Sequence, residues 1–220
     1  MKSWCVPKVD AEYVCRMEDV LDLYEEPYNE KMPVVCFDEK LVQLIENVYP
    51  PILPSSGQAK RIDYKYERKG TCNLFVFFEP LKGWRHIEVT DQRTKIDFAN
   101  CMKNLVNYYP HAEKIRLVMD NLNIHRLANL YEVLAPEEAR KIIKKIEVHH
   151  TPKHASWLNM AEIEISVLSG QCIKRRIGSK EKLSNEIGAY LAQRNERQAK
   201  VIWGFFTPDA REKMGRLYPK

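Results

Sequence analysis

The sequence predicts an α/β protein with a central mixed sheet flanked by helices. Short apolar runs, such as VVCF before Asp38 and RLVM before Asp120, are typical of buried strands. Longer segments carry apolar residues three and four positions apart, which is the spacing of one helix face. Strands first follow one another and then alternate with helices, and this order favours a mixed sheet with helices on its faces.

The first half of the chain supplies one helix and most of the strands. An apolar stripe predicts a helix over residues 9–27, which Pro27 ends. The strand expected at 34–37 ends in Asp38, and residues 42–57 are expected to form a loop because they hold three prolines, two serines and a glycine. The next expected strands are a half-exposed one over 59–70, a buried one over 72–80 and one over 84–90, the last two joined at Gly83 as a hairpin.

The second half alternates helices with strands. A helix over 91–110 is expected to be capped by Asp91 or Thr94, and a buried strand over 114–121 carries Asp120 at its end. The remaining expected elements are two short helices separated at Pro136, a strand over 146–151, a helix capped by Ser156, an amphipathic helix over 180–198 and a short last helix capped by Thr207 or Asp209.

Length and composition suit one domain of moderate size with a tail. We expect an N-terminal acidic helix and linker over residues 1–30, a catalytic α/β domain over 31–175 and a basic helical tail over 176–220 that packs on it. No run of eighteen apolar residues predicts a membrane span, and the N-terminus lacks the apolar core of a signal peptide. The six cysteines are scattered without a C-x-x-C pair, which is typical of reduced cytosolic thiols.

Positive charge is concentrated at the C-terminus. Residues 171–220 hold twelve Lys and Arg against five Asp and Glu, whereas the rest of the chain is slightly acidic. The excess begins at Lys174, Arg175 and Arg176. A basic segment beside a carboxylate-bearing body fits a phosphodiester partner, although charge alone also fits a solvated surface helix.

Two aspartates, Asp38 and Asp120, each follow an apolar strand. Sites in open α/β sheets lie beyond the C-terminal ends of strands, so we expect these carboxylates to lie near one another. Like charges that close need a cation, and Mg²⁺ accepts carboxylate oxygens together with water and phosphate oxygens. A third carboxylate on a nearby helix would complete a two-metal site for phosphoryl transfer.

The segment HASWLNMAEIEI offers two glutamates for that third place, Glu162 and Glu164. Residues two apart lie about 200° apart around a helix, so the two side chains cannot serve the same site. On a helical wheel they flank the apolar stripe on opposite edges. Periodicity therefore leaves the choice between them open.

Three stretches, VVCFDEK, LVMDNLNIH and TPKHASWLNMAEIE, resemble the motifs of DDE transposases of bacterial insertion sequences. These belong to the mariner-related branch of the ribonuclease-H-like transposase and integrase superfamily. The third family motif reads roughly P-x-(Y/H)-(S/A)-x-x-L-N-x-x-E, which Leu158, Asn159 and Glu162 match. The resemblance covers about residues 30–210 and implies a ribonuclease-H-like fold, with a central mixed five-stranded sheet flanked by helices. It selects Glu162, with Asp38 and Asp120, as the catalytic and metal-binding triad.

The resemblance also implies the chemistry. The expected activity is Mg²⁺-dependent DNA strand cleavage and strand transfer, with two Mg²⁺ ions that Mn²⁺ can replace. Glu39 is expected to be structural, and Glu164 to be a surface or packing-edge residue whose change to Gln is mild. The residues expected to contact DNA are Asn121, His125, Lys153, His154, Lys174, Arg175 and Arg176. For His125 the alternatives are contact with the scissile phosphate, orientation of a metal-bound water and capping of the next helix.

Transposases of this kind carry an N-terminal helix-turn-helix region, whereas only 37 residues precede Asp38 here. We therefore expect an active catalytic domain that depends on another chain to recognise the element ends, or a truncated, catalytically idle remnant that binds DNA or a full-length partner. The expected partners are the element ends, the target DNA, and a second copy or a chain that carries the helix-turn-helix. The implied location is the bacterial cytoplasm, at the nucleoid.

Overall fold

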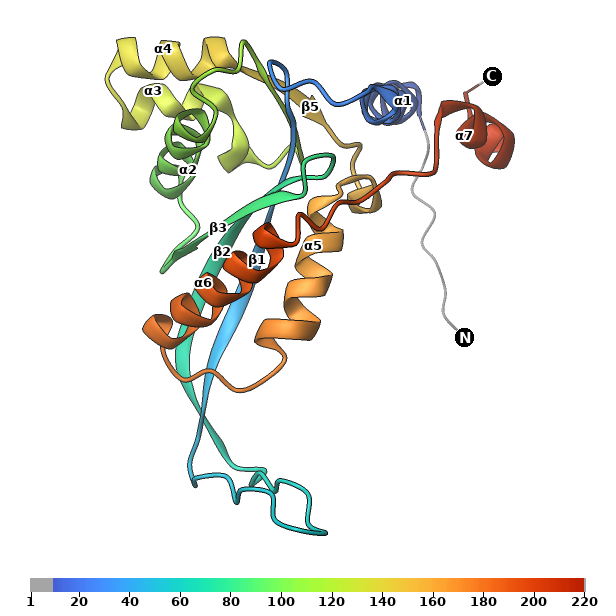
Figure 1. The fold of residues 1–220 in the computed structure, drawn as a ribbon. Coiled ribbons are helices and arrows are strands. Elements are labelled where there is room, and N and C mark those ends of the chain that lie inside the picture. The colour runs from blue at the N-terminus through green and yellow to red at the C-terminus, as the bar shows by residue number, and fades with distance from the viewer. Residues whose placement is uncertain (1–9, 220) are drawn as a thin grey trace.

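The computed structural model describes residues 10–219 and shows a five-stranded mixed sheet with helices on both faces (Figure 1). The strand order is β3-β2-β1-β4-β5. Neighbours β3, β2 and β1 are antiparallel, whereas β1, β4 and β5 run parallel. The strands are β1 (Val34–Asn47), β2 (Tyr66–Glu79), β3 (Trp84–Thr90), β4 (Ile115–Met119) and β5 (Ile146–His150). The predicted mixed five-stranded sheet flanked by helices is confirmed.

Helices pack on the sheet through three apolar cores. One face carries α2, α3 and α4, whose apolar residues cover Phe37 and Phe77; the other face carries α1, α5, α6 and α7. Thr94 caps α2, as one of the two alternatives predicted, and Pro136 is the first residue of α4. The helices are α1 (Ala11–Glu25), α2 (Lys95–Tyr108), α3 (Leu130–Val133), α4 (Pro136–Lys145), α5 (Ala161–Leu168), α6 (Lys180–Glu196) and α7 (Thr207–Met214).

Strand β1 does not end at Asp38, as predicted, but continues to Asn47. Its first four residues are buried, because helices cover both faces there. Beyond Asp38 only one face is covered, so burial alternates: Val42 and Leu44 are buried, whereas Leu41 is exposed. Parallel pairing with β4 stops at Cys36, and Asp38 therefore lies beyond the end of the parallel pair while still inside the strand. The loop predicted from residue 42 begins after Asn47.

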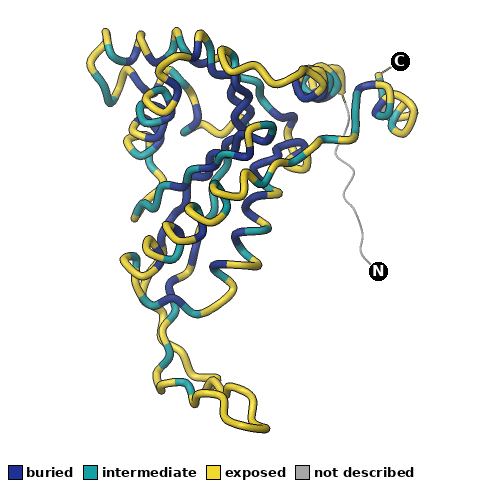
Figure 2. Tube along the Cα trace, in the orientation of Figure 1, coloured by how far each residue is buried: buried dark blue, intermediate teal, exposed yellow. Residues whose placement is uncertain are grey.

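Strand β2 replaces the two strands predicted over 59–70 and 72–80. Its ladder with β1 shifts register between Gln43 and Ile45, beside Gly70 at φ +96°, which is the geometry of a bulge. Residues 59–65 contribute only the isolated bridge of Arg61 to Ile52. They belong to an exposed arm, residues 48–65, that extends away from the sheet (Figure 2). None of the apolar cores formed by residues 10–219 covers the arm, so its alternating sequence forms no regular strand.

The hairpin between β2 and β3 depends on Gly83. Its φ is +73°, and a Cβ there would lie 2.5 Å from the backbone carbonyl of Gln198. The predicted hairpin turn is confirmed, and it also provides a close contact with the chain after α6.

The helix predicted to start at Ser156 is broken. Residues Ser156–Leu158 form a short 3₁₀ turn, η3, in which Ser156 makes no cap, and α5 begins at Ala161. Residues 1–9, which include Cys5 and the start of the predicted N-terminal region, lie outside the described residues. No helix within residues 10–219 is long and apolar enough to cross a membrane.

Candidate active site

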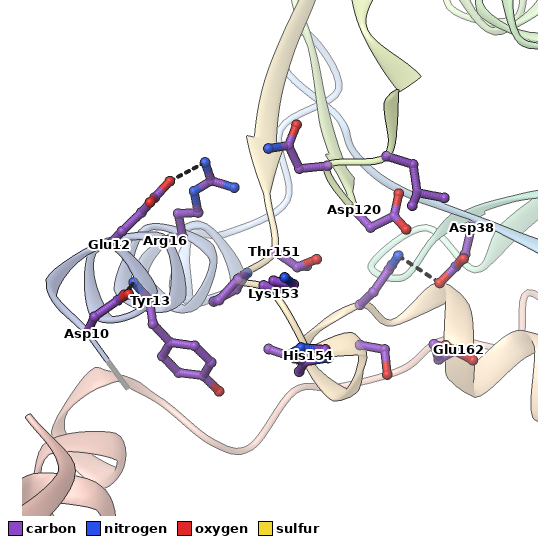
Figure 3. A pocket seen from close by; sticks show the side chains of 16 residues that line it. Asp10, Glu12, Tyr13, Arg16, Asp38, Asp120, Thr151, Lys153, His154 and Glu162 are labelled. Atoms are coloured by element: carbon purple, nitrogen blue, oxygen red, sulfur yellow. Dashed lines mark hydrogen bonds and ion pairs between the residues drawn. The ribbon is translucent and has the colours of Figure 1, made fainter. Parts of the chain in front are cut away.

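An open cavity of about 1110 Å³ lies at the carboxyl end of the parallel strands (Figure 3). Helix α1 forms one wall, and the segment after β4 and the loop 151–156 form others. Asp38, Asp120 and Glu162 all line this cavity. The structure thus brings together the three acids that were predicted to act as one set.

Three separate elements position these acids. Asp38 lies on β1 just past its parallel pairing with β4, and Asp120 directly follows β4. Glu162 is in the first turn of α5. Neighbouring parallel strands end at the same edge of a sheet, which explains the approach of the two aspartates. Figure 3 shows Glu162 on the same side of the cavity as both aspartates, with Glu12 and Arg16 of α1 across from them.

The Asp38 carboxyl is in an unfavourable place for a negative charge. Its pKa is raised to about 7, chiefly because it is buried and further because Glu162 and Asp120 repel the charged form. A hydrogen bond of 2.7 Å from the backbone N–H of Glu39 to Asp38 Oδ1 opposes this shift. Asp38 therefore lies in a field of like charges that a cation would relieve.

The donor chemistry fits a hard divalent cation. All three side chains offer carboxylate oxygens, the ligands that Mg²⁺ prefers in proteins. Within residues 10–219, no three His, Cys, Asp or Glu side chains already converge tightly enough to enclose a metal ion. The three side chains therefore suit Mg²⁺ because they are carboxylates, carry negative charge and line the same cavity.

Asn159 connects Asp38 to the helix that carries Glu162. Its buried side-chain amide donates to Phe37 O at 2.8 Å and to Asp38 Oδ2 at 3.2 Å. Its Oδ1 accepts from the backbone N–H of Ala161 at 3.1 Å, at the start of α5. These bonds break the helix predicted from Ser156 and fix the first turn of α5 against β1. The L-N-x-x-E spacing was the signal for this role, which sequence reasoning used only for alignment.

The loop between β5 and α5 borders the same cavity. Lys153 and His154 are exposed there, and Asn121 is exposed on the segment after β4. The backbone of His154 has φ +64°, in the left-handed region that is costly for a residue with a Cβ. These three residues, predicted to contact DNA, therefore all lie at the cavity beside the acids.

A family model described as DDE superfamily endonuclease matches residues 33–184, a span that includes all three acids. This chain belongs to the DDE superfamily endonucleases. None of the curated proteins compared with this DDE domain matches it.

Solved structures of Mos1 share the fold of this DDE domain. The Mos1 mariner paired end complex with Mn matches at 14% identity and a TM-score of 0.56, covering 90% of this chain and 62% of that one. The Mos1 transposase paired-end complex with left transposon end matches at 13% and 0.59, and the Mos1 strand transfer complex at 14% and 0.57; both cover 90% of this chain and 61% of theirs. The DDE domain thus spans about three-fifths of the Mos1 chains. The predicted ribonuclease-H-like fold is confirmed.

His125 is buried behind the cavity of this DDE domain. Its side chain is 1% exposed, and both ring nitrogens are engaged by carboxylates, at 2.5 Å from Asp120 and 2.8 Å from Glu39. Burial alone would lower the pKa of His125, but the bonds to Asp120 and Glu39 outweigh it and raise the pKa to about 9. Both ring nitrogens of His125 therefore have partners within the protein, and the predicted DNA contact of His125 stays a prediction. Glu39 has the structural place predicted for it.

The basic cluster at the start of the tail lies away from the cavity of the DDE domain. Lys174 is exposed, and Arg175 pairs with Glu186. Arg176 donates to backbone carbonyls of residues 63–65, at the base of the exposed arm. Its guanidinium thus holds the base of the arm, and the DNA contact predicted for Arg176 stays a prediction.

Glu164 is the largest departure from expectation. It was expected at the surface or at the edge of the packed face, but its side chain is 1% exposed. Its carboxylate lies 3.0 Å from Arg85 Nε and 3.0 Å from Arg194 Nη2, and it accepts a hydrogen bond of 2.5 Å from the Tyr190 hydroxyl. A wheel drawn for α5 alone could not reveal this, because both arginines come from distant parts of the sequence.

Helix α1 contributes cavity residues that sequence reasoning missed. Tyr13 and Arg16 line the wall opposite the acids, and Glu12 pairs with Arg16 one helical turn away at 2.5 Å. The helix is acidic overall, so its composition gave no indication that its one basic residue, Arg16, faces the cavity. Only docking of α1 on the sheet brings Arg16 to the site.

Proposed function

We propose that this chain is the catalytic domain of a DDE transposase that cleaves and transfers DNA strands for a bacterial insertion sequence. One observation carries the proposal: Asp38, Asp120 and Glu162 reach one open cavity from three separate elements. The family match and the likeness of fold to Mos1 transposase complexes support it.

The proposed cofactor is a pair of Mg²⁺ ions, with Mn²⁺ as a substitute. Asp38, Asp120 and Glu162 would hold them, because their oxygens are the only acidic donors that the described cavity offers besides Asp10 and Glu12 on its far wall. Such ions, when bound, stabilise the charge that develops on the attacking and leaving oxygens of a phosphodiester. Mos1 complexes contain Mn and Mg, which supports the same choice here.

The chain's own residues would bind and orient the DNA strand. Lys153, His154 and Asn121 present donors beside the acids and are proposed to bind phosphate oxygens. Arg16 offers a further cationic contact from the opposite wall. Asn159 keeps the Asp38 carboxylate and the first turn of α5 in one arrangement. Lys174 and Arg175 remain proposed contacts for DNA that extends beyond the cavity.

The proposed partners are element-end DNA, target DNA, and a second copy or a chain that carries a helix-turn-helix. Paired-end complexes of Mos1 with transposon-end DNA support this set. Residues 31–175 are proposed as the catalytic unit, preceded by the helical N-terminal region and followed by the basic tail from residue 176. A place at the bacterial nucleoid would follow from these partners.

A nicking and joining assay tests the proposal. Purified protein with Mg²⁺ or Mn²⁺ is expected to nick supercoiled plasmid and to join an oligonucleotide with a free 3′-OH into it. Asp120→Asn is expected to abolish both reactions while DNA binding persists, and the exposed Glu181→Gln serves as the control. Cleavage that survives in Asp120→Asn would refute the triad. DNA binding without any cleavage by the unmodified chain would instead identify an idle remnant.

A further inference from the structure

A buried imidazole links two carboxylates behind the cavity. His125 Nδ1 lies 2.5 Å from Asp120 Oδ1, and His125 Nε2 lies 2.8 Å from Glu39 Oε1. Asp120 lines the cavity with a side chain that is 40% exposed, whereas Glu39 is 4% exposed. The bridge therefore runs from the interior to a carboxylate that faces the candidate site.

The imidazole is fixed on all sides. Its ring packs edge-on against Phe37, with ring centroids 5.2 Å apart. It also packs, in a tilted orientation, against Phe98, with centroids 5.3 Å apart. The 3₁₀ turn that carries it, η1 (Asn123–His125), is held by the buried Asn129, whose amide donates to Asn123 O and Ile124 O at 3.0 Å. The ring therefore has little freedom to change its hydrogen-bond partners.

Glu39 is anchored in turn. Its second oxygen lies 2.9 Å from Arg93 Nη1, so both oxygens of this buried carboxylate have partners. Successive side chains of a strand point to opposite faces, which places Glu39 behind the sheet while its neighbour Asp38 faces the cavity. Asp38 and Glu39 are adjacent in the chain and therefore lie on opposite faces of the sheet, Asp38 at the cavity and Glu39 behind it.

We propose that His125, held by Glu39, is a positioning residue that orients the Asp120 carboxylate toward a divalent cation in the cavity. The inference rests on the proposed function of the cavity. With Oδ1 engaged by the imidazole, Oδ2 of Asp120 is the oxygen left for the cavity. Partners of metal-binding carboxylates of this kind hold the ligand in the orientation that binds the ion.

Two substitutions of His125 separate positioning from simple packing. An asparagine amide nitrogen takes about the place of Nδ1 and can still donate to Asp120. A glutamine amide nitrogen takes about the place of Nε2 and can donate only to Glu39. Each variant leaves one carboxylate of the bridge without its imidazole partner, so the two should lose similar stability.

The experiment measures Mn²⁺ affinity by titration followed with electron paramagnetic resonance, together with plasmid nicking and thermal unfolding. His125→Gln is expected to weaken Mn²⁺ binding and nicking by about 10- to 100-fold, with His125→Asn closer to the unmodified protein. His149→Gln is the matched control, because His149 bridges Asp19 and Glu147 at 2.8 and 3.2 Å and neither acid lines the cavity. This control should leave Mn²⁺ affinity unchanged.

The outcomes are distinguishable. Equal Mn²⁺ affinity in His125→Gln, His125→Asn and the unmodified chain would overturn the positioning role while leaving the proposed function standing. Loss of affinity in His149→Gln as large as that in His125→Gln would also overturn it, since the effect would then be general instability. An unmodified protein that binds no Mn²⁺ would remove the proposed function and this inference with it.

Discussion

Glu162 and Glu164 lie two residues apart on α5 and have opposite surroundings. Glu162 lines an open cavity together with two aspartates, and within residues 10–219 no ion pair reaches its carboxylate. Glu164 is buried between Arg85 and Arg194 and also accepts from Tyr190. Helix geometry makes the difference, because the two side chains leave the helix about 200° apart.

The contrast shows how the same residue type serves either chemistry or stability. Around Glu164 the protein supplies the positive charge itself, so the carboxylate has no capacity left for an external cation. Arg85 extends that cluster through its bonds to the carbonyls of Gly83, Arg194 and Ala199, which join the β2–β3 turn to the end of α6. Around Asp38, Asp120 and Glu162 the charge is not balanced, which leaves room for a bound cation.

The largest expected effect tests the chemical side of the contrast. Glu162→Gln should lower the rate of Mg²⁺-dependent plasmid nicking on the order of 10³-fold, because it removes a proposed metal ligand. Its unfolding free energy should change by less than about 1 kcal/mol, since the side chain is partly exposed. Nicking rates and urea unfolding check both parts. Normal nicking by this variant would mean that the third acid has been misassigned.

The stability side is tested at Glu164. Glu164→Ala should lower the unfolding free energy by about 3–5 kcal/mol, because it leaves the buried Arg85 without its counter-charge. From the sequence alone, the expectation was only that Glu164→Gln is mild. Urea unfolding followed by circular dichroism measures the loss, with Glu181→Ala on the surface of α6 as the control. A loss below about 1 kcal/mol would contradict the role assigned to the cluster.

A third prediction concerns how far the negative charge of Asp38 lowers the unfolding free energy. Its folded-state pKa of about 7 exceeds that of an exposed aspartate, near 3.9. The folded protein therefore binds this proton more tightly, and the associated stability is lost as the pH rises through about 7. In EDTA at pH 8, Asp38→Asn should raise the unfolding free energy by about 1–2 kcal/mol, with a smaller gain at pH 5.

Thermal and urea unfolding at the two pH values check this prediction. Glu181→Gln is the control, because Glu181 is exposed and lies outside the cavity. A gain that is equal at pH 5 and pH 8, or a loss at pH 8, would show that Asp38 carries no such charge penalty.

The smallest expected effect concerns Arg16. Arg16→Ala should weaken DNA binding uniformly across sequences and reduce the slope of log affinity against log salt by about 1. Fluorescence anisotropy with a labelled duplex at several salt concentrations measures it. Arg140→Ala is the matched control, because Arg140 is exposed on α4 and lies outside the cavity. An unchanged slope in Arg16→Ala would separate α1 from the DNA-binding surface.

Local patterns in the sequence were sufficient for most of the fold. Apolar runs and periodicity predicted the mixed sheet, the hairpin at Gly83 and the helix that Thr94, one of two predicted caps, begins, because each depends on residues close in the chain. The patterns failed for β1, whose far half is covered on one face only, and for β2, whose residues 66–71 are all exposed. Alternation there is broken by a bulge and by exposed arm residues, so local reading divided the strands wrongly.

The sequence by itself determined which residue types could carry the chemistry: two aspartates after apolar strands, and an L-N-x-x-E segment that resembles one family. Only the tertiary structure decided their neighbours. Glu164 is buried between two arginines, and His125 lies between Glu39 and Asp120. Helix α1 places Arg16 at the cavity. Each of these contacts joins residues that are far apart in the chain. Such contacts depend on how elements pack, and no local periodicity records them.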